Sequence, residues 1–126
     1  MRVIITCVAA LVPALWVALP ASGQSIEYNS EEVAPSVYLF APNDAGLGNV
    51  AAVLSEGEAL VVDAGGTPGA ALQILSQLRD LGMNRVVALV NTHWHDDHIW
   101  GNQVFVDAFP DLQIHAHPAT LEGIRD

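Results

Sequence analysis

The chain has 126 residues, of which 52% are hydrophobic, and its formal net charge is −10 because 14 acidic residues oppose only 4 basic ones. Nucleic acids and anionic membrane surfaces are bound through basic patches, so we exclude both as partners. The single cysteine, Cys7, lies in an amino-terminal segment that we expect to be removed, which excludes disulfides from the mature protein.

The amino terminus is typical of an exported protein. Arg2 precedes an apolar run over residues 3–19, and small residues follow at Ala21 and Gly23. This pattern predicts a secretory signal peptide over residues 1–23, cleaved after one of these small residues. The alternative is a membrane anchor, because the run is near the ~17-residue lower limit for a transmembrane helix. No basic cluster follows the run, so we expect cleavage, a secreted or periplasmic protein, and no stable membrane association afterwards.

Short apolar or alternating runs predict the strands of the mature chain. Residues 24–32 are polar and predict a loose start. Five strands are predicted, over residues 37–40, 49–55, 59–62, 85–90 and 112–117. The turn Glu56-Gly57 joins the second and third of them into a hairpin.

Three helices are predicted between and after these strands. The first has Thr67 as its N-cap, Pro68 at its first position and Gly82 as its stop. Its apolar stripe comprises Ala71, Ile74, Leu75, Leu78 and Leu81. A short helix beginning near residues 99–102 would carry Val104, Phe105 and Phe109 inward and be broken by Asp107, Pro110 and Asp111. A last helix begins at Pro118. A hairpin followed by strand–helix–strand units predicts an α/β layered domain.

The sequence Thr-His-Trp-His-Asp-Asp-His at residues 92–98 follows the predicted buried strand 85–90. The carboxyl ends of such strands are where α/β sheets place their ligands. Imidazole and carboxylate are zinc ligands, so we predict a metal site formed by His93, His95, Asp97 and His98. Side chains two apart share a face only where the chain is extended or turning, which we expect here. The alternative is a polar loop that binds nothing.

This cluster resembles the signature of the metallo-β-lactamase-fold hydrolases. The resemblance extends to Gly101-Asn102, to the run 60–65 that contains Asp63, and to the run 48–54. The resemblance covers residues 33–126. It implies that residues 24–126 form the amino-terminal half of an αβ/βα sandwich whose carboxyl-terminal half is missing. The mature chain of about 103 residues is near half of the roughly 200 that such a large single domain needs. We therefore expect a fragment or a truncated gene product.

The resemblance also implies two zinc ions per complete domain. His93 and His95 would hold the first and Asp97 and His98 the second, with the remaining ligands coming from the missing half. It makes Asp63 a support that orients the histidines from behind, although Asp63 could instead be only a turn former before Gly65.

The function implied is a secreted zinc-dependent hydrolase that attacks a lactam, thioester, lactone or related bond in a small molecule with a metal-bound hydroxide. Zinc lowers the pKa of bound water from 15.7 to about 7, and Asp97 would bind the second metal and hold the hydroxide or carry a proton. Trp94 and Trp100 either wall the substrate pocket or simply pack. The alternative is a truncated, non-catalytic fragment or a metal-binding module with a partial zinc site.

Two further expectations concern the rest of the chain. His115 and His117 repeat the His-x-His spacing, but the family has no ligands there, so we expect an exposed strand face or a core edge. The sheet over residues 37–62 and 85–117 should have an uncovered apolar face. Residues 24–126 alone should therefore self-associate or fold poorly, bind zinc weakly and hydrolyse neither a lactam nor a thioester.

Overall fold

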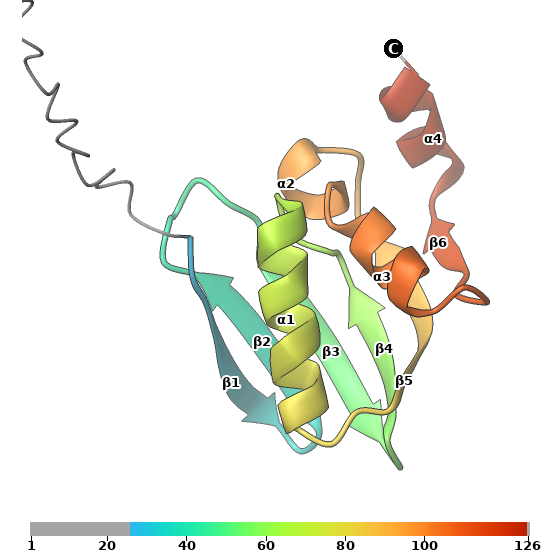
Figure 1. The fold of residues 1–126 in the computed structure, drawn as a ribbon. Coiled ribbons are helices and arrows are strands. Elements are labelled where there is room, and N and C mark those ends of the chain that lie inside the picture. The colour runs from blue at the N-terminus through green and yellow to red at the C-terminus, as the bar shows by residue number, and fades with distance from the viewer. Residues whose placement is uncertain (1–25, 126) are drawn as a thin grey trace, which may run out of the picture.

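A computed structural model describes residues 26–125, so the predicted signal peptide lies outside the described residues. The described chain forms one six-stranded sheet with helices packed against it (Figure 1). The strands are β1 (Tyr28–Ala34), β2 (Val37–Pro42), β3 (Val50–Ser55), β4 (Glu58–Val62), β5 (Arg85–Asn91) and β6 (Ile114–Ala116). The helices are α1 (Pro68–Asp80), α2 (Asp96–Ile99), α3 (Asn102–Ala108) and α4 (Pro118–Arg125). No helix among residues 26–125 is long and apolar enough to cross a bilayer.

The order of strands in the sheet follows their order in the chain. Strands β1 to β4 form an antiparallel meander, in which the turn Glu56-Gly57 joins β3 to β4. Strand β5 then pairs parallel with β4, and β6 pairs parallel with β5. A parallel neighbour requires a crossover, and α1 provides the one between β4 and β5. The carboxyl ends of β4 and β5 therefore lie at the same edge of the sheet.

Helix α1 forms where its capping residues predict it. The Thr67 hydroxyl accepts a hydrogen bond from the Ala70 N–H at 3.0 Å, and Pro68 occupies the first turn. The chain leaves the helix through Gly82 at φ +93°, a left-handed conformation that glycine adopts without strain. Leu81 is 38% exposed, so it lies outside the buried stripe to which the sequence assigned it.

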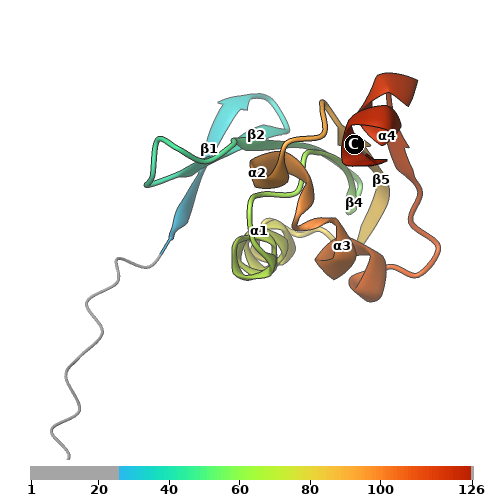
Figure 2. The same ribbon diagram turned by 90° about the horizontal axis from the view of Figure 1, so that it is seen from above.

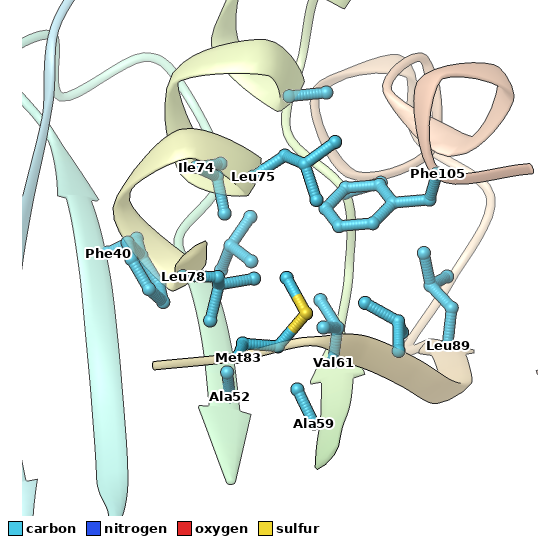
Figure 3. Close-up of a cluster of buried hydrophobic side chains, with 14 of the residues drawn as sticks. Phe40, Ala52, Ala59, Val61, Ile74, Leu75, Leu78, Met83, Leu89 and Phe105 are labelled. Carbon is cyan, nitrogen blue, oxygen red and sulfur yellow. The ribbon is translucent and has the colours of Figure 1, made fainter. Parts of the chain in front are cut away.

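The hydrophobic core lies between the sheet and helices α1 and α3, which cover the same face (Figure 2). Phe40 from β2 and Val61 from β4 meet Ile74 and Leu78 from α1, and Phe105 of α3 closes the cluster beside Leu89 (Figure 3). These six side chains are fully buried. Burial of each such side chain contributes about 1.5–3 kcal/mol, so this face holds the domain together.

The opposite face of the sheet is apolar and open to solvent. Val53, Leu60 and Val87 from the three central strands are between 37% and 46% exposed and line a shallow hollow. Alternation along β3 and β4 sends every second side chain to this face, and apolar residues occupy several of these outward positions. The structure thus has the uncovered face that the sequence predicts; self-association remains a prediction.

The α/β layered arrangement confirms the predicted architecture, but some elements differ from the prediction. Residues 28–34 form β1 rather than a loose start, because backbone pairing with β2 holds a strand in which only Tyr28 is buried. Asp107 does not break a helix; it lies within α3, where it accepts a hydrogen bond from the Gln103 side chain at 2.6 Å. The predicted strand 112–117 shortens to the exposed residues 114–116.

Candidate functional site

The predicted metal ligands lie in one loop at the carboxyl edge of the sheet. Strand β5 ends at Asn91, and the following residues 92–101, here called the histidine loop, include the short helix α2. His93 and His95 stand in the non-helical part of the loop, as their spacing predicts. Asp97 and His98 stand on α2, a single helical turn that the sequence did not predict; the short helix predicted to begin near residues 99–102 is α3.

The structure brings the four predicted ligands together. The ring of His93 lies 4.5 Å from that of His95 and 4.1 Å from that of His98, measured between centroids. The carboxylate of Asp97 lies 3.3 Å from His98 Nε2. Asp96, in contrast, is exposed. Three imidazoles and one carboxylate therefore form a single partly solvent-accessible cluster.

Asp63 holds this cluster in place through hydrogen bonds. Its side chain is buried, and it follows β4 directly, so it meets the histidine loop where β4 and β5 end side by side. Asp63 Oδ1 accepts a hydrogen bond from the Thr92 N–H at 2.8 Å. Oδ2 accepts one from the Thr92 hydroxyl at 2.8 Å and another from His98 Nδ1 at 2.7 Å. The backbone of Asp63 is held at φ +62°, a strained conformation that these bonds fix in place.

The same hydrogen bonds determine the tautomers of two histidines. A carboxylate only accepts, so the neutral form of His98 carries its proton on Nδ1, which leaves a lone pair on Nε2. The single proton of the Thr92 hydroxyl points to Asp63, so that oxygen can only accept from His93 Nδ1, 3.0 Å away. His93 is therefore also protonated on Nδ1 and bare on Nε2. One buried carboxylate thus orients two imidazoles, directly for His98 and through Thr92 for His93.

Backbone hydrogen bonds fix the histidine loop against the turn at residues 63–66. The Ala64 N–H donates to His98 O at 2.8 Å, and the Gly101 N–H donates to Gly65 O at 3.0 Å. A Cβ at Gly101 would lie 2.0 Å from the Ala64 carbonyl oxygen, so only glycine allows this approach. These contacts hold the histidine loop against Asp63.

An amide pair closes the base of the loop. Asn91 donates from Nδ2 to Asn102 Oδ1 at 3.1 Å, and Asn102 donates back to Asn91 Oδ1 at 2.8 Å. Asn91 is buried and immediately precedes the histidine loop, and Asn102 immediately follows it. The reciprocal bonds therefore tie the two ends of the loop together. Sequence reasoning placed Asn102 in the family pattern but did not predict its partner.

Tyr28 is a further residue beside the cluster, and sequence reasoning missed it because the strand that carries it was not predicted. It is 3% exposed, and its hydroxyl donates to Gly48 O at 3.0 Å. Burial raises the pKa of the Tyr28 hydroxyl; the Gly66 backbone hydrogen bond lowers this pKa, and the charge of Asp97 raises it further. The net upward direction keeps the hydroxyl protonated, and therefore a donor, at neutral pH.

The two predicted pocket tryptophans differ in their surroundings. The Trp94 ring meets that of His95 edge-on, with centroids 4.7 Å apart. It also lies against Gly123 of α4, where a Cβ would approach the indole to 2.4 Å. The indole of Trp94 therefore packs between His95 and helix α4, although 45% of the residue is exposed. Trp100 is 56% exposed beside the loop. A role for either in substrate binding stays a prediction.

His115 and His117 are both exposed, as the sequence predicts. His115 pairs with Val90 across β5 and β6. His117 has a local structural role, because its Nδ1 accepts a hydrogen bond from the Ala119 N–H at the start of α4.

The donor chemistry of the cluster fits zinc, because neutral imidazole nitrogens and carboxylate oxygens are its usual ligands. The bare Nε2 atoms of His93 and His98 meet that requirement before any metal binds. Within residues 26–125, no three His, Cys, Asp or Glu side chains are placed so that together they could hold one ion. The assignment of His93 with His95 to one ion and of Asp97 with His98 to another, which the resemblance implies, stays a prediction.

Comparison with known proteins identifies the fold. Residues 43–126 match the family model of the metallo-beta-lactamase superfamily. The hydroxyacylglutathione hydrolase of Trichormus variabilis is 42% identical over 57 residues, which are 45% of this chain and 20% of that protein. The hydroxyacylglutathione hydrolase of Acaryochloris marina is 33% identical over 78 residues, which are 62% of this chain and 25% of that protein.

Solved structures show the same architecture. DIM-1 metallo-beta-lactamase superposes with a TM-score of 0.67 at 23% identity, over 80% of this chain and 47% of that one. A metallo beta lactamase from Erythrobacter litoralis superposes with a TM-score of 0.64 at 23% identity, over 80% and 48%. The chain thus spans about half the length of these structures and a fifth to a quarter of the two curated relatives. The predicted fold class is confirmed.

Proposed function

The chain belongs to the metallo-beta-lactamase superfamily, and on that premise we propose that it supplies part of the active site of an exported, zinc-dependent hydrolase. The observation that carries this proposal is the hydrogen-bonded set Asp63–Thr92–His93–His98, which leaves bare imidazole nitrogens on two adjacent rings. A carboxylate is costly to bury, and this one is held under the histidines by hydrogen bonds from Thr92 and His98.

Each side chain of the cluster has a proposed task. His93 and His95 would hold one zinc ion, and Asp97 and His98 would hold a second. When bound, zinc would supply Lewis-acid chemistry, polarising a carbonyl and making a water molecule nucleophilic at neutral pH. The carboxylate of Asp97, half-buried beside His98 Nε2, would accept a hydrogen bond from a water molecule in the site and carry its proton. Trp94 and Trp100 flank the cluster and offer apolar surface to the substrate.

For the whole protein, we propose a small-molecule thioester as the substrate class ahead of a lactam. The curated relatives named hydroxyacylglutathione hydrolase are 33–42% identical over the matched segments, whereas the lactamase structures are about 23% identical. Both substrate classes present a carbonyl carbon to the attacking water, so the same loop suits either.

Export is a separate proposal, supported by the apolar run at residues 3–19 and the small residues that follow. We expect the exported protein to begin near Ser22 or Gln24. Amino-terminal sequencing of the protein recovered from the cell envelope or medium tests this; a mature chain that starts at Met1 and stays in the membrane would contradict it.

The metal assignment is tested by zinc analysis of single alanine variants of the whole protein. His93→Ala and His95→Ala should each remove most of the zinc of the first site, because an open catalytic site has no spare ligand. Asp97→Ala and His98→Ala should preferentially empty the second. His115→Ala is the matched control and should retain all zinc. Unchanged zinc in all four loop variants would contradict the proposed function.

A further inference from the structure

Tyr28 joins two loops that flank the histidine loop. Its hydroxyl donates to Gly48 O at 3.0 Å, in the loop between β2 and β3. The backbone of Gly66, in the turn after β4, lies close enough to the same hydroxyl to lower its pKa. Because Tyr28 is almost completely buried, both contacts are made away from bulk water, where losing a hydrogen bond is most costly.

Gly48 packs closely against His98 and Asp97, and Gly66 packs closely against Asp97. A Cβ at Gly48 would lie 2.7 Å from both Cε1 and Nε2 of His98, and 3.0 Å from Asp97 O. A Cβ at Gly66 would lie 3.0 Å from the Asp97 Cα. The backbones of both glycines therefore touch the second predicted ligand pair directly, and a shift of either glycine would move that pair.

Tyr28 is itself held firmly. Helix α1 bonds its backbone from both sides: Gln73 Oε1 accepts from the Tyr28 N–H at 3.1 Å, and Gln77 Nε2 donates to Tyr28 O at 2.8 Å. The backbone of Tyr28 is therefore tied to α1, which fixes the position of its hydroxyl between the two flanking loops.

We propose that Tyr28 is a positioning residue for the second metal pair: through Gly48 and Gly66, its hydroxyl fixes where Asp97 and His98 present their ligand atoms. This inference rests on the proposed function, since it assigns Tyr28 to a site that binds metal. Removal of the hydroxyl leaves the aromatic ring in the core but releases both glycines. The result is a looser Asp97–His98 pair in a domain that still folds.

The test compares Tyr28→Phe with Tyr38→Phe in the full chain. Both variants remove one hydroxyl from a strand residue packed on the same core, but Tyr38 is on β2. Two measurements are made: zinc affinity by competition with a chromophoric chelator, and the ring-nitrogen NMR signals of all histidines in the metal-free protein. Tyr28→Phe should weaken zinc binding about tenfold, the lower end of the effect of losing a group that orients a ligand. It should also shift or broaden the His98 ring signals and leave those of His115 unchanged.

A second variant guards against general loss of stability. Gly48→Ala keeps Tyr28 and the core intact but pushes a methyl group towards His98 Nε2, so it should perturb the same His98 signals and weaken zinc binding. Its control is Gly46→Ala in the same loop, where a Cβ would meet only the Asp44 side chain at 3.3 Å. This control should leave both measurements unchanged.

The outcomes separate the inference from the proposed function. Unchanged His98 signals and zinc affinity in both Tyr28→Phe and Gly48→Ala would overturn the positioning role, even if the parent binds zinc. A parent chain that binds no zinc, but whose His98 signals respond to Tyr28→Phe and not to Tyr38→Phe, would overturn the proposed function and keep the positioning of His98. Equal effects of Tyr28→Phe and Tyr38→Phe would show a merely structural role.

Discussion

Replacement of Asp63 by Asn tests whether a buried carboxylate prepares the histidines for metal. The two side chains have the same shape, and both tolerate the left-handed backbone found at this position. Asn presents an N–H₂ group in place of one carboxylate oxygen. With Nδ2 in the place of Oδ2, it would face two groups that now donate to that oxygen, the Thr92 hydroxyl and His98 Nδ1.

The conflict is relieved only if both partners change. His98 must move its proton to Nε2 so that Nδ1 can accept from Asn, and this places a hydrogen where the metal would bind. The Thr92 hydroxyl must turn and donate towards His93 Nδ1, which moves the proton of that ring to Nε2 as well. Both imidazoles then present N–H groups to the metal instead of lone pairs.

The magnitudes follow from the bonds exchanged. Hydrogen bonds to charged groups contribute about 1.5–3 kcal/mol, but the amide regains a neutral bond to each partner. We expect a net loss of about 1–2 kcal/mol in the free energy of unfolding, or a fall in Tm of several degrees for a domain of this size, since about 1 kcal/mol corresponds to roughly 4–8 °C. Zinc affinity should fall about 10–100-fold, as when outer ligand partners are removed.

The assay is zinc competition against a chelator together with thermal unfolding of the metal-free protein. The matched control is Asp96→Asn, which removes the same charge from an exposed carboxylate in the same loop. It should change zinc affinity by less than about threefold, since exposed charges are largely screened. Equal zinc affinity in the parent and Asp63→Asn, or equal losses in Asp63→Asn and Asp96→Asn, would refute the tautomer argument.

Three further predictions concern the loop and the open sheet face. Gly101→Ala should cost about 3 kcal/mol of unfolding free energy, because its Cβ would overlap the Ala64 carbonyl oxygen; a denaturant titration that shows no loss would contradict this close approach. Asn91→Leu and Asn102→Leu should each lower the free energy of unfolding by about 1–3 kcal/mol, since each leaves the partner amide without its hydrogen bonds. The double variant should lose less than the sum of the two; strict additivity in a double-mutant cycle would show that the pair is not coupled. Leu60→Glu should reduce self-association in sedimentation experiments, because it charges the exposed apolar face; association of the variant equal to that of the parent would show that another surface is responsible.

Sequence reasoning was most successful for elements whose residue pattern directly reflects capping or burial in the core. Helix α1 follows from the cap at Thr67 and from an apolar period that must face a core. The position of the histidine loop follows from a buried strand with a turn at its end. Asp63 could be assigned beside the loop from the resemblance alone, and its hydrogen bonds to Thr92 and His98 agree with the supporting role assigned to it.

The missed features depend on tertiary contacts that leave little pattern in the sequence. Strand β1 shows no alternation of apolar residues, because it is held by backbone bonds to β2 and by the side chains of Gln73 and Gln77 rather than by a buried face. Without β1, Tyr28 could not be placed near the site. Strand β6 shows the opposite case. Alternating residues predicted a strand over residues 112–117, but the strand covers only residues 114–116, and all three are exposed.

X-ray absorption at the zinc edge of the zinc-loaded protein shows whether the histidine loop binds zinc through its imidazoles. We expect nitrogen and oxygen neighbours at about 2.0–2.1 Å, with the outer scattering typical of imidazole rings. This scattering should fall sharply in a His93→Ala, His95→Ala double variant and persist in a His115→Ala, His117→Ala double variant. A zinc environment of water oxygens alone, or imidazole scattering that only the second double variant removes, would contradict the account.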